Sequence, residues 1–280
     1  LLLVLAFAIG SATFWQSVHS SSTLPSGESN KTSASMADGK AFLALAAADE
    51  DGNEEIEGAT YDPMAFDALL GSYVSNGLVN YKALTNNEEF TDFVGSLKES
   101  TPSGMTTDGQ LAFWVNAYNA CVISNVIAHP KIKGPLEVDG FFDKVKFDVA
   151  GQQLTLNEIE NTIVRPTFKE PLIHFGLVCA ARSCPPLIPK AYTEANVREE
   201  LAANARNYLA DKKQNRFDAK SGKLSLSKIF EWYKADFGGD DAGLIAFAKQ
   251  YGPEEMRAGL EKAKKVTVAF VEYDWTLNGQ

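Results

Sequence analysis

DGQLAFWVNAYNACVISNVIAHP, residues 108–130, is the stretch that decides the fold class. It is long, mostly apolar and stopped by its final proline, which cannot continue a helix, so it predicts one helix over 108–128. Asn116 and Asn119 lie three positions apart in this helix, on neighbouring faces, with Tyr118 between them. Because buried amides need hydrogen-bond partners, the two asparagines either hold an adjacent loop or bind a substrate, and both interpretations stay open.

Shorter elements are expected on both sides of this helix. Asp62 and Pro63 predict the start of one helix, and alternating residues around Ala150 and Gly151 predict a hairpin. Further helices are expected at 88–97, 156–165, 193–210, 227–236, 240–251 and 253–264, and strands at 172–178 and 266–275. Because strands and helices do not alternate regularly, we expect an α+β fold: a mainly helical single domain over 60–280 with a small, partly antiparallel sheet.

The N-terminal residues have a different composition. LLLVLAFAIGSATFW (1–15) is apolar throughout but shorter than the roughly 20 residues of a membrane span. The chain starts with Leu rather than Met, so we expect a truncated secretory leader over 1–18, either a cleaved signal peptide or a signal anchor in the membrane. Residues 19–59 are Ser-rich and then acidic, as in a flexible linker. We therefore expect the domain to be secreted, periplasmic or otherwise extracytoplasmic.

The charge of the chain excludes one class of partner. Its formal net charge is −10, and its isoelectric point is about 4.9. Binding to nucleic acid needs clustered Lys and Arg that neutralise phosphates, so we expect no nucleic-acid partner. The expected partner is an unknown small molecule or a peptide.

HFGLVCAARSCPPLIP (174–189) holds two of the three cysteines, Cys179 and Cys184. A catalytic cysteine needs a base, usually His, that generates the thiolate. His174 is near in sequence, but on a strand over 172–178 its side chain would face away from Cys179, about 16 Å distant at roughly 3.3 Å per residue. A direct contact would therefore require the chain to fold back near Gly176.

Other roles for the cysteines stay open. A zinc site is short of ligands, because the pair has only one histidine nearby, and we expect no metal. A Cys179–Cys184 disulfide suits an oxidising compartment. Cys121, in the long helix, is expected to be a buried and inert thiol.

Five segments resemble signature blocks of the DUF547 family, a domain of unknown function with exported bacterial members. They are WVNAYNA (114–120), LNEIENTIVRP (156–166), HFGLVCAARSCPPL (174–187), LSKIFEWYKADFG (226–238) and YDWTLNG (273–279), in the family's order. The resemblance implies that Glu160 and Arg165 lie beside Cys179. It also implies a histidine where this chain has Asn161, so any chemistry of that histidine is missing here.

These observations lead to two hypotheses about function. The first is a thiol-dependent hydrolase or acyl transferase, loosely like papain or transglutaminase enzymes in fold and chemistry, that needs no cofactor. Its expected catalytic residues are Cys179, His174 and Glu160, and its expected substrate-binding residues are Asn116, Tyr118, Asn119 and Arg165. The second is a non-catalytic extracytoplasmic binding module in which Cys179 and Cys184 form a structural disulfide. In that case Glu160 and Arg165 would be a buried ion pair that pins a short helix.

Overall fold

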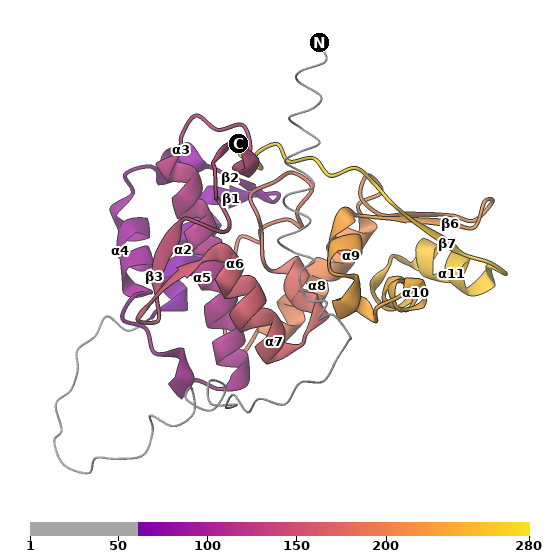
Figure 1. Cartoon of the computed structure of the whole chain (residues 1–280), viewed down its shortest axis with the longest axis horizontal. Coiled ribbons are helices and arrows are strands. Elements are labelled where there is room, and N and C mark those ends of the chain that lie inside the picture. Colours follow the sequence, from indigo (N-terminus) through magenta and orange to yellow (C-terminus); the bar gives the residue numbers. More distant parts are fainter. Residues whose placement is uncertain (1–60) are drawn as a thin grey trace, which may run out of the picture.

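The computed structural model describes residues 61–280 (Figure 1). The leader expected over 1–18 and the linker expected over 19–59 lie outside the described residues and stay predictions. Within 61–280 the chain is mainly helical, with two two-stranded sheets and one three-stranded sheet, as the sequence predicts for an α+β fold.

The long helix predicted over 108–128 is confirmed as α5 (Thr107–Ala128). Thr106 caps its start by accepting a hydrogen bond from the Gly109 N–H at 3.1 Å. Nearly every residue of α5 from Leu111 to Val126 is buried, because helices pack around it on several sides. Among the described residues α5 is also long and apolar enough to cross a membrane, but here it is the core helix of the domain.

One end of the domain is built on the first part of the described chain (Figure 1). It contains α2 (Pro63–Tyr73), β1 (Val74–Ser75), β2 (Leu78–Val79), α3 (Tyr81–Leu84) and α4 (Glu88–Ser96). Asp62 caps α2, as its position before Pro63 predicts. Asn76 and Gly77 both have positive φ and form the turn between β1 and β2.

A hairpin and a helical segment follow α5. One-turn 3₁₀ helices flank α5 itself: η1 (Pro102–Gly104) precedes it and η2 (Pro135–Glu137) follows it. The predicted hairpin is confirmed, because β3 (Lys146–Val149) and β4 (Gln152–Thr155) pair antiparallel. The helix predicted over 156–165 is present but irregular. It consists of α6 (Leu156–Glu158), η3 (Ile159–Val164) and α7 (Arg165–Phe168), and η3 is a π-helix.

The prediction of a strand over 172–178 is wrong. Its first part is a 3₁₀ helix, η4 (Pro171–Phe175), which Glu170 caps by accepting from the Leu172 N–H at 3.1 Å. The N–H groups of Gly176 and Leu177 both donate to the Ile173 carbonyl, so the chain turns back at Gly176. An apolar run of this length fits a strand and a helical turn equally well, and the cap and the glycine decide between them.

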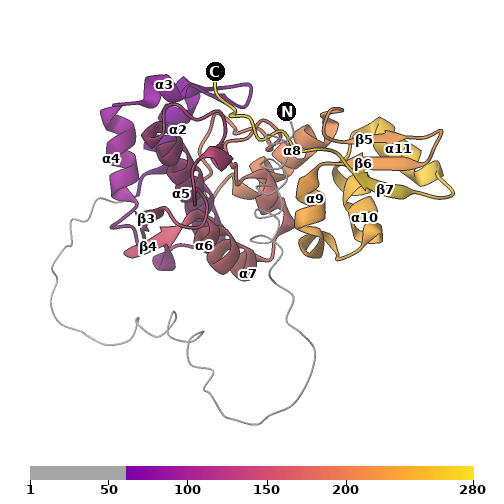
Figure 2. The ribbon, with the colours of Figure 1, turned by 45° about the horizontal axis from the view of Figure 1, so that its top comes forward.

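The other end of the domain carries a mixed sheet covered by helices (Figure 2). Its elements are α8 (Val197–Ala210), β5 (Arg216–Asp218), β6 (Lys223–Leu226), α9 (Lys228–Trp232), η5 (Lys234–Phe237), α10 (Asp241–Tyr251), α11 (Glu254–Lys262) and β7 (Thr267–Phe270). The hairpin strands β5 and β6 are antiparallel, whereas β6 and β7 are parallel. The sequence predicts these helices, although the one expected over 227–236 is divided into α9 and η5. Of the strand expected over 266–275, only Thr267–Phe270 forms β7, and the short strands β5 and β6 are not predicted.

Residues 271–280, which we call the C-terminal strap, run back from β7 to the β1–β2 hairpin (Figures 1 and 2). The N–H of Arg182 donates to the Thr276 carbonyl at 2.8 Å, and the N–H of Val79 donates to the Asn278 carbonyl at 2.9 Å. The strap thus connects the two ends of the domain and crosses the loop that holds both cysteines.

Candidate functional site

A small cavity lies in the interior, where η3, η4 and the strap meet the loop that carries Cys179 and Cys184, which we call the cysteine loop. Its volume is about 20 Å³, enough for about one water molecule. Its lining is Tyr118, Glu160, His174, Leu177, Cys179, Cys184, Ile229, Tyr233 and Tyr273. The cavity therefore gathers five residues that the sequence singles out, although they come from separate segments: Tyr118, Glu160, His174, Cys179 and Cys184.

Cys179 and Cys184 form a disulfide, with their Cα atoms 6.3 Å apart. Both residues are 7% exposed. The Tyr273 hydroxyl, from the strap, lies 3.3 Å from Cys179 Sγ and 3.2 Å from Cys184 Sγ. Ala180, directly after Cys179, has a φ of 62°, a left-handed conformation that is uncommon for a residue with a Cβ.

His174 is 3% exposed and is oriented by a carboxylate. Its Nε2 donates a hydrogen bond to Asp236 Oδ2 at 2.7 Å, and its ring stacks on Tyr233 with centroids 3.9 Å apart. Because the chain turns at Gly176, His174 and Cys179 line the same cavity. The prediction that they face opposite sides was wrong, since it depended on the strand.

Arg165 binds the same Asp236 carboxylate as His174 does. Its guanidinium donates to both carboxylate oxygens, at 2.7 and 3.0 Å, and to Asn161 Oδ1 at 2.6 Å. Burial alone would raise the pKa of Asp236, but the hydrogen bonds from His174 and Arg165 hold it well below its usual range. Arg165 thus has Asp236 as its ion-pair partner, and Asn161 takes the place of the histidine that the family resemblance implies.

Glu160 is 4% exposed and forms hydrogen bonds with the hydroxyls of Tyr118 and Tyr233. Burial, and then the Glu160 carboxylate, raise the pKa of both tyrosines well above the usual value. In the π-helix the N–H of Arg165 donates to the Glu160 carbonyl, so residues five apart lie one turn apart. Burial lowers the pKa of Arg165, but Asp236 and, more weakly, Glu160 raise it above its usual value.

The two asparagines of α5 hold loops. Asn119 donates to the Gly176 carbonyl at 2.8 Å and accepts from the Val178 N–H at 2.9 Å. Asn116 makes the same pair of hydrogen bonds to the backbone of Tyr192, at 2.7 and 3.0 Å. In both side-chain amides, therefore, the NH₂ group and the carbonyl oxygen each have a hydrogen-bond partner. A role in substrate binding stays a prediction for Asn116, Asn119 and Arg165, which lie outside the lining of the cavity.

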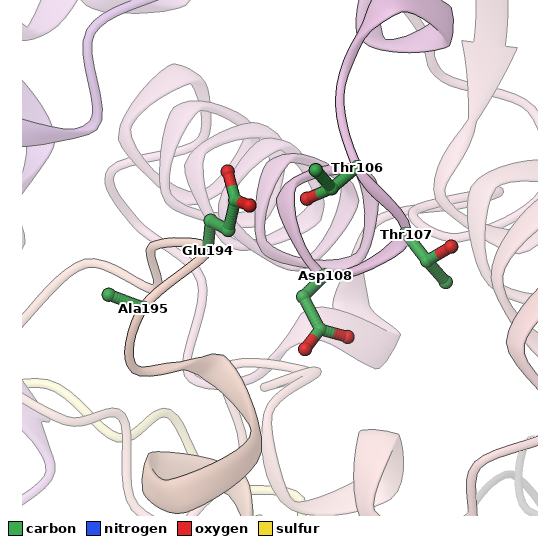
Figure 3. Close-up of a pocket in the computed structure, with 5 residues that line it drawn as sticks. All are labelled: Thr106, Thr107, Asp108, Glu194 and Ala195. Atoms are coloured by element: carbon green, nitrogen blue, oxygen red, sulfur yellow. The ribbon is translucent and has the colours of Figure 1, made fainter.

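Two larger hollows open on the surface. A groove of about 660 Å³ lies on the outer side of the cysteine loop, and Cys184 lines it as well as the inner cavity. An open depression lies at the start of α5, lined by Thr106, Thr107, Asp108, Glu194 and Ala195 (Figure 3). The two carboxylates of this depression point in different directions, and Asp108 is paired with Arg198 at 2.8 Å, so they form no convergent site.

Within residues 61–280, no three His, Cys, Asp or Glu side chains gather closely enough to hold a metal ion.

Residues 102–209 match the DUF547 family, whose description is protein of unknown function. This match supports membership of the DUF547 family. The matched range contains His174 and both cysteines of the cavity, and it ends before Tyr233, Asp236 and Tyr273. No curated protein and no solved structure matches the chain.

Two residues of the site were not anticipated from the sequence, Asp236 and Tyr273. Both lie in segments that resemble family blocks, 226–238 and 273–279. In those segments the aromatic residues are predicted to be core residues. Asp236 has lysines nearby in the sequence, so it is predicted to lie on the surface. Only the tertiary fold places Asp236 against His174.

Proposed function

We propose that this DUF547 domain is a thiol-dependent hydrolase or acyl transferase in which Cys179 is the nucleophile. The observation that carries the proposal is that His174, oriented by Asp236, lines the same buried cavity as Cys179. A cysteine, a histidine and an orienting carboxylate are the three parts from which many acyl-transfer sites are built.

In this scheme each group has one role. Asp236 occupies Nε2 of His174, which leaves Nδ1 as the ring nitrogen that takes the proton from the Cys179 thiol. The thiolate then attacks the acyl carbon, and the protonated imidazole returns its proton to the leaving group. Water hydrolyses the thioester, or an amine accepts the acyl group. Glu160 holds the phenols of Tyr118 and Tyr233 beside the reacting atoms.

The disulfide sets a condition on this chemistry. While Cys179 is bonded to Cys184 it carries no thiol, so the proposed enzyme is inactive until the bond is reduced. The cavity of about 20 Å³ also has no room for an acyl group. Access requires a shift of the wall that carries Tyr273, which belongs to the strap.

A second function, a non-catalytic binding module, rests on the disulfide itself. A bridge that ties two buried residues of one loop stabilises the fold without any reaction. In this alternative, His174, Asp236 and Arg165 are a buried structural network, and the ligand binds on the surface.

A labelling experiment separates the two functions. The full chain with Cys184→Ser leaves Cys179 as a free thiol without any reductant, and an alkyne-bearing iodoacetamide then reports the reactivity of its thiolate. We expect rapid labelling at Cys179 near neutral pH and at least tenfold slower labelling when His174→Gln is added. Cys179→Ser is the matched control. Slow labelling that does not depend on His174 would support the binding module.

A further inference from the structure

The disulfide forms part of the wall between two hollows. The inner cavity is lined by Cys179 and Cys184, whereas the groove of about 660 Å³ on the surface is lined by Cys184 and not by Cys179. The groove also takes Arg182, Pro185 and Pro186 from the same loop and Asp211, Lys213 and Gln214 from the segment after α8. Its volume is that of a typical small-molecule site. A molecule bound in the groove therefore contacts the disulfide at Cys184 and not at Cys179.

The groove offers two cationic side chains to an anion. Arg182 and Lys213 are exposed, and neither side chain has a hydrogen bond or an ion pair within the described part of the chain. The lining also holds two carboxylates, which keep their charge: Asp211 accepts from the Lys213 N–H and Asp274 accepts from the Thr276 N–H, each at 2.9 Å. The two cationic donors without acceptors suit a carboxylate or a sulfonate.

The geometry points to the groove as the binding site of an anionic low-molecular-weight thiol that attacks Cys184 and releases Cys179 into the inner cavity. This inference rests on the proposed function, because it supplies the reduction that frees the nucleophile. A compact thiol fits better than a protein thiol, since Cys184 is only 7% exposed at the edge of a concave groove.

The exchange balances in two steps. The thiolate of the donor forms a bond to Cys184 Sγ, the protein S–S bond breaks, and its electron pair leaves on Cys179 as a thiolate. A second donor thiolate then attacks the mixed disulfide, which yields the oxidised donor and the Cys184 thiolate. Two donor molecules are oxidised to one disulfide, and the protein disulfide gains two electrons.

The direction of attack is set by the groove, because Cys184 lines it and Cys179 does not. The hydrogen-bond donors around the sulfurs do not set it, since the Cys179 N–H and the Tyr273 hydroxyl lie 3.1 and 3.2 Å from Cys184 Sγ. The leaving sulfur, Cys179 Sγ, also has the Tyr273 hydroxyl within reach as a hydrogen-bond donor, at 3.3 Å. Glu160 is the carboxylate of this lining, and its hydrogen bonds with Tyr118 and Tyr233 temper its repulsion of a thiolate. Better stabilisation of the leaving thiolate speeds the exchange.

The first test follows the mixed disulfide. The oxidised full chain is treated with 2-mercaptoethanesulfonate, 2-mercaptoethanol or cysteamine, quenched with N-ethylmaleimide, and mapped by peptide mass spectrometry. We expect the donor on Cys184 and the maleimide on Cys179. Per unit of thiolate, the sulfonate should react about fivefold faster than cysteamine, and Arg182→Gln with Lys213→Gln should bring this ratio close to one. A donor adduct on Cys179, or no dependence on charge, would overturn the inference.

A second measurement avoids the reversible step. Cys179→Ser leaves a single thiol at Cys184, and Cys184→Ser leaves one at Cys179, so each is titrated with methanethiosulfonate reagents of opposite charge. We expect Cys184 to react faster with the anionic reagent than with the cationic one, and Cys179 to show no such preference. The same anionic preference at both thiols, or at neither, would contradict a groove-side attack. Neither experiment uses an acyl substrate or the His174 dependence, so the exchange can fail while the labelling of Cys179 succeeds, and the reverse.

Discussion

His174 and Asp236 are 62 residues apart in the sequence, yet Nε2 of the histidine lies 2.7 Å from Oδ2 of the aspartate. Arg165 completes the group by binding both oxygens of the same carboxylate. One carboxylate thus serves a buried histidine and a partly buried arginine. Its loss would leave His174 without its acceptor and Arg165 with Asn161 alone.

Asp236→Asn should therefore destabilise the domain by about 3 kcal/mol, because it removes the ion-pair partner of the partly buried Arg165 guanidinium. Asp241→Asn is the matched control, since Asp241 pairs with Lys234 at 2.6 Å on the surface, where a pair contributes about 0–1 kcal/mol. Urea unfolding at neutral pH measures both variants. Equal losses in the two would show that the network around His174 contributes no more than a surface ion pair.

The same carboxylate predicts a dependence on pH. The pKa of Asp236 in the folded state is held below its unfolded value, which is about 3.9 for an aspartate. Its contribution to stability is therefore complete above about pH 4 and is lost as the pH falls through the folded-state pKa. Urea midpoints from pH 6 down to pH 2 should fall more steeply for the natural chain than for Asp236→Asn. Parallel curves would contradict this.

Glu160→Gln should lower the stability by about 2 kcal/mol, because an amide replaces a buried carboxylate that two phenols bind. Glu158→Gln is the control. Glu158 closes a capping box with Thr155, where Gln also serves, so its replacement should cost less than about 0.5 kcal/mol. Thermal melts compare the two. If they melt alike, the polar centre around Glu160 is not a buried one.

Asn119→Ala should cost about 2–3 kcal/mol, since it leaves the Val178 N–H and the Gly176 carbonyl buried without partners. Hydrogen exchange of the peptide that contains Val178 should speed up in this variant before global unfolding. Asn207→Ala, at an exposed position of α8, should be neutral or slightly stabilising because Ala is the better helix former. A slow Val178 amide in Asn119→Ala would mean that the loop keeps its shape without this clamp.

The oxidised natural chain should not react with iodoacetamide until it unfolds. Two of its cysteines are bonded to each other, and Cys121 is fully buried, which raises the pKa of its thiol above the usual range. After mild reduction, adducts should form first in the 179–184 loop and only in denaturant at Cys121. Mass spectrometry of timed samples measures this order. Early modification of Cys121 would mean that α5 is more open than its packing implies.

Much of the fold follows from local signals in the sequence. The long helix α5 ends before Pro130, and the β3–β4 hairpin turns at Ala150 and Gly151, both with positive φ. These features are predictable because the deciding groups are neighbours in the sequence. The cysteine loop also stood out, because Cys179, Cys184 and His174 lie within one short stretch.

The geometry of the site could not be predicted from the sequence, because it depends on contacts between residues far apart in the chain. The turn at Gly176, which brings His174 and Cys179 to one cavity, depends on a cap by Glu170 and on the clamp by Asn119 from another helix. The π-helix that aligns Glu160 with Arg165 has no simple sequence signature, because the same residues also fit an α-helix. Asp236 and Tyr273 reach the cavity through tertiary packing alone.

Because the C-terminal strap is synthesised last, the cysteine loop is covered only at the end of synthesis. Tyr273, which touches both sulfurs, is made 94 residues after Cys179. At about 5–20 residues per second, the ribosome adds it about 5–20 seconds later. In the later part of that interval the cysteine loop is outside the ribosome and still lacks its cover, so an oxidant can reach it. The bond between Cys179 and Cys184 can therefore form on the nascent chain, and the arrival of the strap then shuts it in.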